Sequence, residues 1–157
     1  MTLLFILATP PVTSGSRTTA RVDMASDIIG FSRPRVVNLF PIVTRSVTDI
    51  SALGIEQDPW VVNRGALLDA LGEANEVFLA YGVAEPSGPA RVHHRSQVQW
   101  LHEQISQLEL KTWTVGGRTR HPSRWQRYTS KIYPTLTFRD ALKLSLQTEA
   151  DNLGLVN

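Results

Sequence analysis

Short apolar runs alternate with stretches in which apolar residues recur every three or four positions, and this alternation limits the possible folds. Four apolar runs predict strands, at residues 3–8, 35–40, 76–82 and 110–115. Helical spacing marks residues 18–31, a helix starting at Asp58, residues 89–108, a helix starting at Thr137 and a short helix near residues 47–53. We therefore predict one α/β domain over residues 1–157: a three-layer αβα sandwich with a mostly parallel four-stranded sheet.

Two of these helices have recognisable starts. Asp58 precedes Pro59, which suggests a capping carboxylate followed by proline in the first turn. Thr137 and Asp140 have the spacing of a capping box, in which the Thr hydroxyl accepts a hydrogen bond from the main chain three residues later. Both signals predict helix boundaries that a structure can test.

The composition limits the cellular context. The chain has 157 residues, 42% of them hydrophobic, and no apolar run long enough to cross a bilayer. Residues 1–8 lack the basic start of a signal peptide and favour a buried first strand. There is no cysteine, which fits a reducing compartment. We expect a cytoplasmic monomer without a membrane partner.

Charge is distributed unevenly along the chain. Residues 44–90 carry two basic and seven acidic groups, whereas residues 91–143 carry ten basic and three acidic groups and all four histidines. This change of sign suggests a basic face for an anionic partner. Solvated helix faces would produce the same pattern.

The most basic segment is residues 114–128, which follows a predicted strand and contains two consecutive glycines. It presents His121, Ser123 and Trp125 among four arginines: Arg118, Arg120, Arg124 and Arg127. Guanidinium groups can position phosphates, while an aromatic ring can stack on bases or wedge between them. The alternative is a solvated basic loop whose Trp125 packs back on the protein.

Unusual residues follow every predicted strand, and the carboxyl ends of parallel strands share one rim. The segments concerned are residues 9–15, Asn38, Tyr81 with Gly82, and the basic segment. Asn38 interrupts an apolar run, so its amide either bonds a neighbouring loop or points into a site. His93, His94 and His102 lack the spacing of a metal site, and we expect neither metal nor cofactor.

Four short motifs, taken in order, resemble those of the uracil-DNA glycosylase superfamily. They are Leu7-Ala8-Thr9-Pro10, Val36-Val37-Asn38, Phe78-Leu79-Ala80-Tyr81-Gly82 and His121-Pro122-Ser123. The Val-Val-Asn-Leu-Phe stretch also resembles an uncharacterised bacterial family that we take to be related. The resemblance implies a superfamily-like fold and a DNA glycosylase, which flips a nucleotide out of DNA, cleaves its N-glycosidic bond and leaves an abasic site.

The resemblance also implies residue roles. His121 would donate a hydrogen bond to the departing pyrimidine, and Asn38 would read the base edge beside Pro11 and Tyr81. Ser123 and the four arginines would hold phosphates, with Trp125 or Arg124 filling the space left by the flipped base. Thr9 stands where the superfamily usually has Asp, Asn or Glu to position water. Asp23 or Asp27, with Asp23 preferred, would compensate.

The substrate expectation rests on Pro11. Uracil-specific relatives have a bulky tyrosine at this position, so Pro11 and the small residues after it, through Gly15, leave room at C5 of a pyrimidine. We expect a C5-modified base such as hydroxymethylcytosine or its glucosylated form in phage DNA, in phage defence or repair. Two alternatives stay open: a non-catalytic nucleic-acid-binding module, and an α/β enzyme for a small phosphorylated ligand, which the lack of phosphate-binding glycine motifs disfavours.

Overall fold

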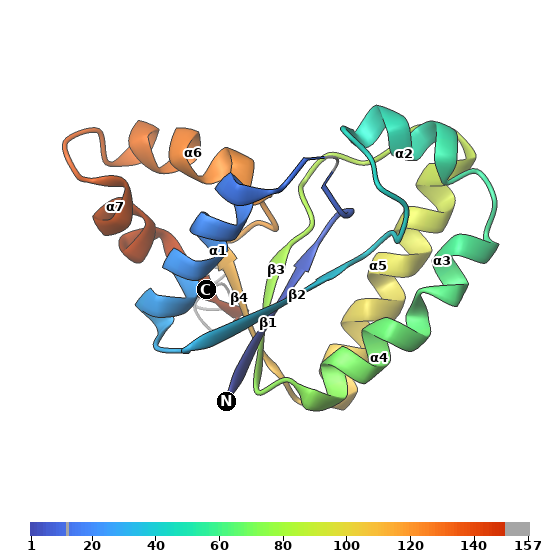
Figure 1. Cartoon of the computed structure of the whole chain (residues 1–157), viewed down its shortest axis with the longest axis horizontal. Coiled ribbons are helices and arrows are strands. Elements are labelled where there is room, and N and C mark those ends of the chain that lie inside the picture. Colours follow the sequence, from blue (N-terminus) through green and yellow to red (C-terminus); the bar gives the residue numbers. More distant parts are fainter. Residues whose placement is uncertain (12, 150–157) are drawn as a thin grey trace, which may run out of the picture.

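A five-stranded sheet lies at the centre of the molecule (Figure 1). The computed structural model describes residues 1–11 and 13–149. The strand order is β2-β1-β3-β4-β5, in which β1 to β4 are parallel and β5 is antiparallel to β4. The strands are β1 (Thr2–Leu7), β2 (Arg33–Asn38), β3 (Glu76–Ala80), β4 (Lys111–Val115) and β5 (Leu146–Thr148). The predicted α/β class with a mostly parallel sheet is confirmed, but four strands was wrong, because a three-residue strand has too little sequence pattern to detect.

Helices cover both faces of the sheet (Figure 1). One face carries α1 (Ser16–Ile29), α6 (Trp125–Ile132) and α7 (Phe138–Ser145). The other carries α2 (Val47–Leu53), α3 (Asp58–Val62), α4 (Arg64–Glu73) and α5 (Pro89–Gln107). Among residues 1–11 and 13–149, no helix has the length and apolar character needed to cross a membrane.

The alternation of side chains along the strands divides the core in two. In β1, Leu3 and Phe5 pack toward α1, whereas Leu4 and Ile6 pack toward α5, and all four are fully buried. The same alternation continues at the carboxyl ends. Asn38 pairs in register with Leu7, whose side chain faces α1, whereas Tyr81 belongs to the core on the α5 side. These two predicted site residues therefore start from opposite faces of the sheet.

The edge strand β2 differs from its prediction. It begins and ends two residues before the predicted run of 35–40, and Val36 is 44% exposed because β2 has a neighbour on one side only. Leu39 and Phe40 follow the strand and are buried, with main-chain N–H groups that donate to Leu7 and Ala8 oxygens. The carboxyl ends of β2 and β1 are thus bonded together.

The two predicted helix starts have different outcomes. The Thr137 hydroxyl accepts from the Asp140 N–H at 3.2 Å, so the capping bond is confirmed. Asp58 is the first residue of α3 and does not cap it, because the N-cap position is Gln57. The helix predicted from Asp58 also divides at Asn63, which ends α3 and occupies the N-cap position of α4 without a side-chain capping bond.

The basic segment is only partly a loop. It turns through Gly116 and Gly117, both with positive φ, and a Cβ at Gly116 would overlap the Tyr128 ring. A single 3₁₀ turn, η1 (Pro122–Arg124), then leads directly into α6. Because α6 begins directly after η1, the side chains that follow His121 are held by helical main chain.

Candidate functional site

A cavity of about 550 Å³ lies beside α5, at the carboxyl ends of β3 and β4. Three segments line it: Tyr81 to Val83 with Glu85, one face of α5 from His94 to His102, and the turn from Gly117 to Thr119. Two hydrogen bonds join the strand ends, Gly82 N–H to Thr119 O at 2.7 Å and the Thr119 hydroxyl to Gly82 O at 2.8 Å. Two walls of the cavity are therefore fixed to each other.

Tyr81 and His102 form a pair within the cavity. The Tyr81 hydroxyl and His102 Nε2 are 2.9 Å apart. Tyr81 is 9% exposed, and burial raises the pKa of its phenol. His102 is exposed as a residue, and partial burial of its ring lowers its pKa. The pair is therefore uncharged at neutral pH.

His94 lies at the other end of the same wall. Its side chain is 8% exposed, and its Nδ1 is buried without a hydrogen-bond partner among the residues that the structure describes. Its ring stands edge-on to Trp60, with ring centres 6.1 Å apart. Burial is the main cause that lowers the pKa of His94, so the imidazole is neutral and has an unused nitrogen.

One carboxylate and two guanidinium groups complete the cavity. Arg95 donates from Nε to both Glu85 oxygens at 3.1 Å and from Nη2 to Oε2 at 2.9 Å. This contact lowers the pKa of Glu85 and keeps the carboxyl ionised. Arg118 is exposed on the opposite wall and makes no ion pair with any described residue. The cavity thus offers a carboxylate, neutral donors and a free cation.

His121, unlike His94, has a structural role in the main chain around it. Its Nδ1 accepts the Ser123 N–H at 3.1 Å and lies 2.9 Å from the Ser123 hydroxyl, so the side chain caps η1. Nδ1 carries no proton, because it accepts from a main-chain N–H, and the ring proton lies on Nε2. Burial, followed by nearby Arg124 and Arg21, lowers the pKa of His121. His121 does not line the cavity.

The other residues predicted to act in catalysis or base binding are dispersed. The Thr9 hydroxyl is 2.7 Å from that of Thr44, and Asp23 is exposed on α1 without a partner among the described residues. The Oδ1 of Asn38 is buried without a partner in that part of the chain, on the α1 side. Pro11 is exposed, and Val12 lies outside the described residues. Of the predicted catalytic and base-binding residues, only Tyr81 lines the cavity.

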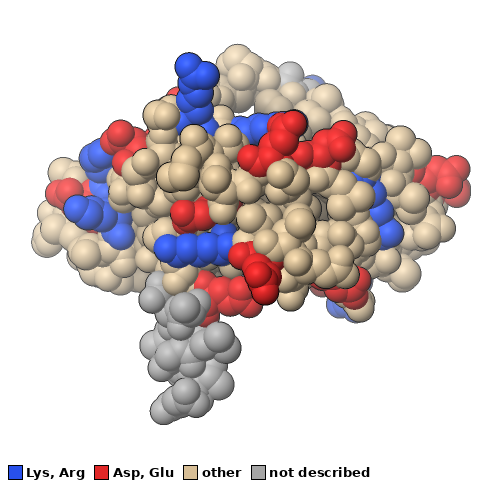
Figure 2. Space-filling view, turned by 90° about the horizontal axis from the view of Figure 1, so that it is seen from below, with Lys and Arg blue, Asp and Glu red and all other residues tan. Residues whose placement is uncertain are grey.

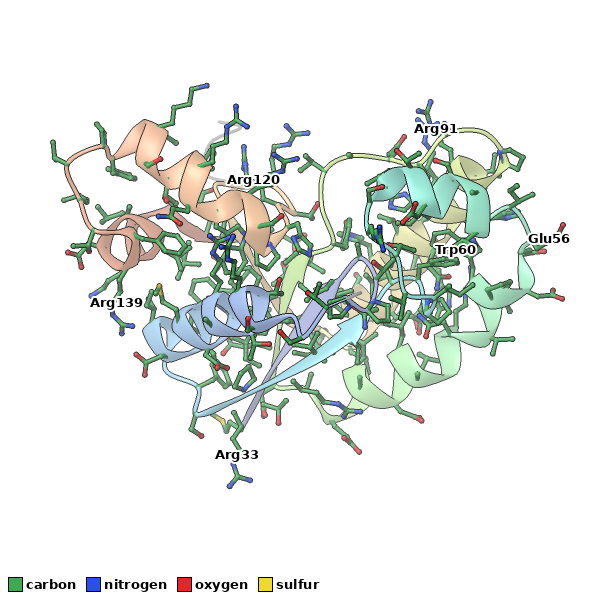
Figure 3. The ribbon with its side chains drawn as sticks, turned by 45° about the horizontal axis from the view of Figure 1, so that its top comes forward. Arg33, Glu56, Trp60, Arg91, Arg120 and Arg139 are labelled. Carbon is green, nitrogen blue, oxygen red and sulfur yellow. The ribbon has the colours of Figure 1, made fainter. Side chains whose placement is uncertain are left out.

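Trp125 corrects one DNA-binding prediction. The ring is fully buried, lies 5.3 Å from Phe78 and donates from Nε1 to Arg120 O at 2.8 Å. It is not available to stack on a base, so that role was wrong and the alternative in which it packs on the body is confirmed. Figure 3 shows the neighbouring Arg120 beside α6. Arg120 donates to Val115 O and Gly116 O and lies 3.8 Å over the Tyr128 ring, so its guanidinium is used inside the protein.

The remaining predicted arginines face solvent. Arg124 and Arg127 are exposed and make no ion pair with a described residue, as is the case for Arg118. Arg17, in the first turn of α1, is also exposed and makes no ion pair with a described residue. It precedes Arg21 by one helical turn, and Arg21 donates to Pro122 O at 2.8 Å, so Arg17 lies on the side of α1 that meets η1.

Sequence reasoning missed three cavity residues in this role: Glu85, His94 and His102. His94 and His102 are eight residues apart on one helix, and this spacing returns to nearly the same face after two turns. That spacing, on a helix that follows the strand ending at Tyr81, was the signal available. The same histidines do not form a metal site, because the described residues contain no group of three suitable ligands.

These features define an α/β protein with a ligand-sized crevice at the carboxyl edge of its parallel strands. The chain belongs to the DUF1643 family, described as a protein of unknown function, whose sequence profile matches residues 2–123. No curated protein and no solved structure matches the chain. The matched range contains every residue that lines the cavity and ends before α6 and α7 begin.

The family assignment corrects the resemblance to the uracil-DNA glycosylase superfamily. The family identified is DUF1643, and nothing in the comparisons indicates membership of that superfamily. The resemblance rested on motifs of three to five residues, which recur in unrelated chains. The functional argument below therefore uses the geometry of the cavity and not those motifs.

Proposed function

We propose that the protein is a DNA glycosylase that takes a flipped nucleotide into the cavity beside α5 and hydrolyses its N-glycosidic bond. The observation that carries this proposal is the cavity's set of groups: two neutral imidazoles, a phenol and an ionised carboxylate within about 550 Å³. That volume lies in the range of ligand sites. The position at the carboxyl edge of a parallel sheet is also where such folds bind ligands.

The groups suit the charges that develop in the reaction. The C1′–N bond breaks, the base leaves with both electrons and the sugar becomes cationic. A water oxygen then bonds C1′, and one of its protons is transferred to the base. The N–H groups of His94 or His102 would stabilise the negative charge on the base, while Glu85 would hold the water and face the cationic sugar.

Free arginines at the same edge support DNA as the substrate. Arg17, Arg118, Arg124 and Arg127 are exposed and unpaired within the described residues, and α6 has no acidic residue. Guanidinium groups in this state are available to phosphates. The opposite edge, at the amino ends of the strands, mixes acidic and basic side chains (Figure 2). At the carboxyl edge, free arginines lie beside the cavity.

A pyrimidine with a C5 substituent, such as hydroxymethylcytosine or its glucosylated form, is the proposed substrate. The volume of the cavity supports a substituted base, because it exceeds that of a pyrimidine ring several-fold. Pro11 gives no support, because it does not line the cavity. Gln99 and Arg95 add hydrogen-bonding groups to its wall, and hydroxyl substituents would use them.

A non-catalytic nucleic-acid-binding module is the second candidate, and one observation favours it. Glu85 already accepts three hydrogen bonds from Arg95, and the Thr9 hydroxyl is bonded to Thr44. In this state neither group is free to act as a base. The two candidates share the cavity and the arginines but differ in whether a covalent bond breaks.

The deciding experiment incubates the protein with oligonucleotides that contain uracil, cytosine, hydroxymethylcytosine or its glucosylated form, and then heats them in alkali. Abasic sites break under these conditions, so strand breaks support the glycosylase. Glu85→Gln should abolish the breaks and retain DNA binding. Binding without breaks supports the second candidate, and neither binding nor breaks overturns both.

The arginines permit a separate test of the binding face. The logarithm of DNA affinity should fall linearly with the logarithm of salt concentration, and replacing Arg124 and Arg127 by glutamine should reduce the slope by about 2. Arg33→Gln is the matched control, because Arg33 is exposed, unpaired within the described chain and points away at the opposite edge (Figure 3). Equal effects of both replacements would exclude the carboxyl edge as the DNA-binding face.

A further inference from the structure

A hydrogen bond between Tyr81 and His102 joins two of the segments that line the cavity. Tyr81 follows β3 and His102 lies on α5, and the phenol oxygen is 2.9 Å from His102 Nε2. The rings meet edge-on, with centres 6.4 Å apart and planes at 89°. Tyr81 is buried whereas His102 is exposed, so the bond ties a fixed group to a side chain that a ligand in the cavity can contact.

The direction of this hydrogen bond follows from the acidity of its two groups. Burial raises the pKa of the Tyr81 phenol more than the neighbouring Thr119 hydroxyl lowers it, so the phenol keeps its proton. A phenol is a stronger acid than a neutral imidazole N–H, and the bare imidazole nitrogen is a stronger acceptor than a phenol oxygen. Tyr81 therefore donates to His102 Nε2.

The direction of the bond determines which nitrogen of His102 carries the proton. Partial burial lowers the pKa of His102 more than the Glu149 carboxylate raises it, so at neutral pH the ring has a single proton. Because Nε2 accepts from Tyr81, that proton lies on Nδ1. Within the described chain no residue accepts a hydrogen bond from Nδ1. His102 thus presents an unused N–H.

Two other histidines of the protein carry a proton on the opposite nitrogen. A carbonyl oxygen can only accept, so His93 Nε2, which is 3.0 Å from Ile55 O, must donate. His121 Nδ1 accepts a main-chain N–H, and its proton therefore lies on Nε2. Neutral histidine in water also favours the Nε2–H form. His102 differs from all of these, and its bond to Tyr81 explains the difference.

An N–H at this position suits the reaction proposed above. The departing base gains negative charge, which an N–H stabilises and which the lone pair of a bare nitrogen would repel. His94, the other imidazole of the cavity, is only 8% exposed and its Nδ1 is enclosed by the protein. The exposed ring of His102 is therefore the better placed of the two to contact a base.

We propose that Tyr81 is a positioning residue that holds His102 as the Nδ1–H tautomer, so that His102 presents its N–H to the departing base. This assignment rests on the proposed function and selects His102 as the donor. Tyr81 then acts through the imidazole, in place of the direct contact with the base that the sequence suggested.

The first test observes the tautomer directly. Hydrogen–nitrogen correlations of histidine rings in NMR distinguish a protonated Nδ1 from a protonated Nε2. His102 should show the former, and His93 and His121 in the same spectrum should show a protonated Nε2. Tyr81→Phe should move His102 toward the Nε2–H form. Tyr133→Phe, which removes a hydroxyl that does not line the cavity, should leave it unchanged.

The second test measures the consequence for the reaction. In single-turnover assays Tyr81→Phe should slow base release at least about fivefold, because most His102 rings no longer present an N–H. The dissociation constant for DNA should stay within about twofold, because the exposed arginines are intact. Tyr133→Phe should change neither quantity. A full rate of base release in Tyr81→Phe overturns the proposal.

The outcomes separate this inference from the proposed function. A protonated Nε2 on His102 in the unsubstituted protein overturns the positioning role, even if bases are released from DNA. An unchanged tautomer in Tyr81→Phe does the same. A protonated Nδ1 that is lost in Tyr81→Phe, without base release from any oligonucleotide, would leave the tautomer assignment standing and refute the glycosylase. The spectrum of the unsubstituted protein decides the tautomer even where Tyr81→Phe does not fold.

Discussion

The cavity beside α5 and the turn at residues 120–124, which contains η1, lie at the same edge of the sheet, and both contain histidine and arginine. They differ in how their polar groups are bonded. In the turn, His121 bonds Ser123 and Arg120 bonds Val115 O, whereas in the cavity His94 has an unbonded nitrogen and Arg118 is free within the described chain. Residue type and position are therefore not enough to locate a site, and the bonding state of each group distinguishes structure from function.

The turn has a clear structural purpose in this comparison. His121 caps η1, Trp125 anchors α6 in the core, and Arg120 fixes the main chain before them. This framework holds Arg124 and Arg127 outward at the start of α6. The basic segment thus presents two exposed arginines, while its aromatic and imidazole groups stabilise the fold.

The largest effect that we expect is on stability, from Trp125→Ala. Removing a fully buried aromatic side chain should lower the free energy of unfolding by about 3–5 kcal/mol, because the cavity left behind is not refilled. Urea unfolding followed by circular dichroism measures the change. Trp100→Ala is the control, since Trp100 is only half-buried beside Arg64 and should cost less. A variant with unchanged stability and weakened DNA binding would reverse our assignment of Trp125.

The next prediction compares the rate of base release after a substitution in the cavity and after one in the turn. His102→Ala should slow base release about a hundredfold, because a donor within the cavity is lost, and one such donor is typically worth that much. His121→Ala should stay within a few-fold of the unsubstituted rate. Single-turnover assays at saturating protein compare the two, and a larger loss at His121 would move the site to the turn.

The sequence predicted the order of β1 to β4 and of the helices other than α6, because these signals are local. Periodicity within one segment identifies β1 or α5, and parallel strands bring their carboxyl ends to one rim. It did not predict α6, whose Trp125 is buried by a contact with Phe78, a residue distant in sequence. Such long-range packing leaves no local pattern.

The composition of the site was less predictable for a related reason. Successive side chains along a strand alternate between the two faces of the sheet, so a shift of one residue moves a side chain to the other face. In this protein Asn38 and Tyr81 lie on opposite faces. The sequence marked both as rim residues without showing that the sheet separates them. The cavity depends instead on α5, whose His94 and His102 meet the residues after β3 only in the folded structure.

A smaller effect tests the structural role of His121. His121→Ala should lower the free energy of unfolding by about 1 kcal/mol, because the cap on η1 is lost, whereas His121→Asn retains an acceptor and should cost less. Urea midpoints of both variants, measured beside the unsubstituted protein, give the comparison. Equal losses for the two variants would show that the cap is not what His121 contributes.

The smallest effect that we expect is a pH dependence of stability shared by the two regions. Burial lowers the pKa of His94 and of His121 below the ordinary histidine value of 6.5, so near and below that pH the unfolded chain binds protons that the folded chain does not. The stability that these groups contribute is therefore complete above about pH 6.5 and is lost as pH falls through their folded pKa values. Urea midpoints between pH 7.5 and 5 measure the loss in a window where exposed carboxylates stay ionised, and His94→Gln should make the dependence shallower. A protein that became more stable over this fall in pH would show that these imidazoles are paired as cations, and the neutral cavity on which the comparison rests would be excluded.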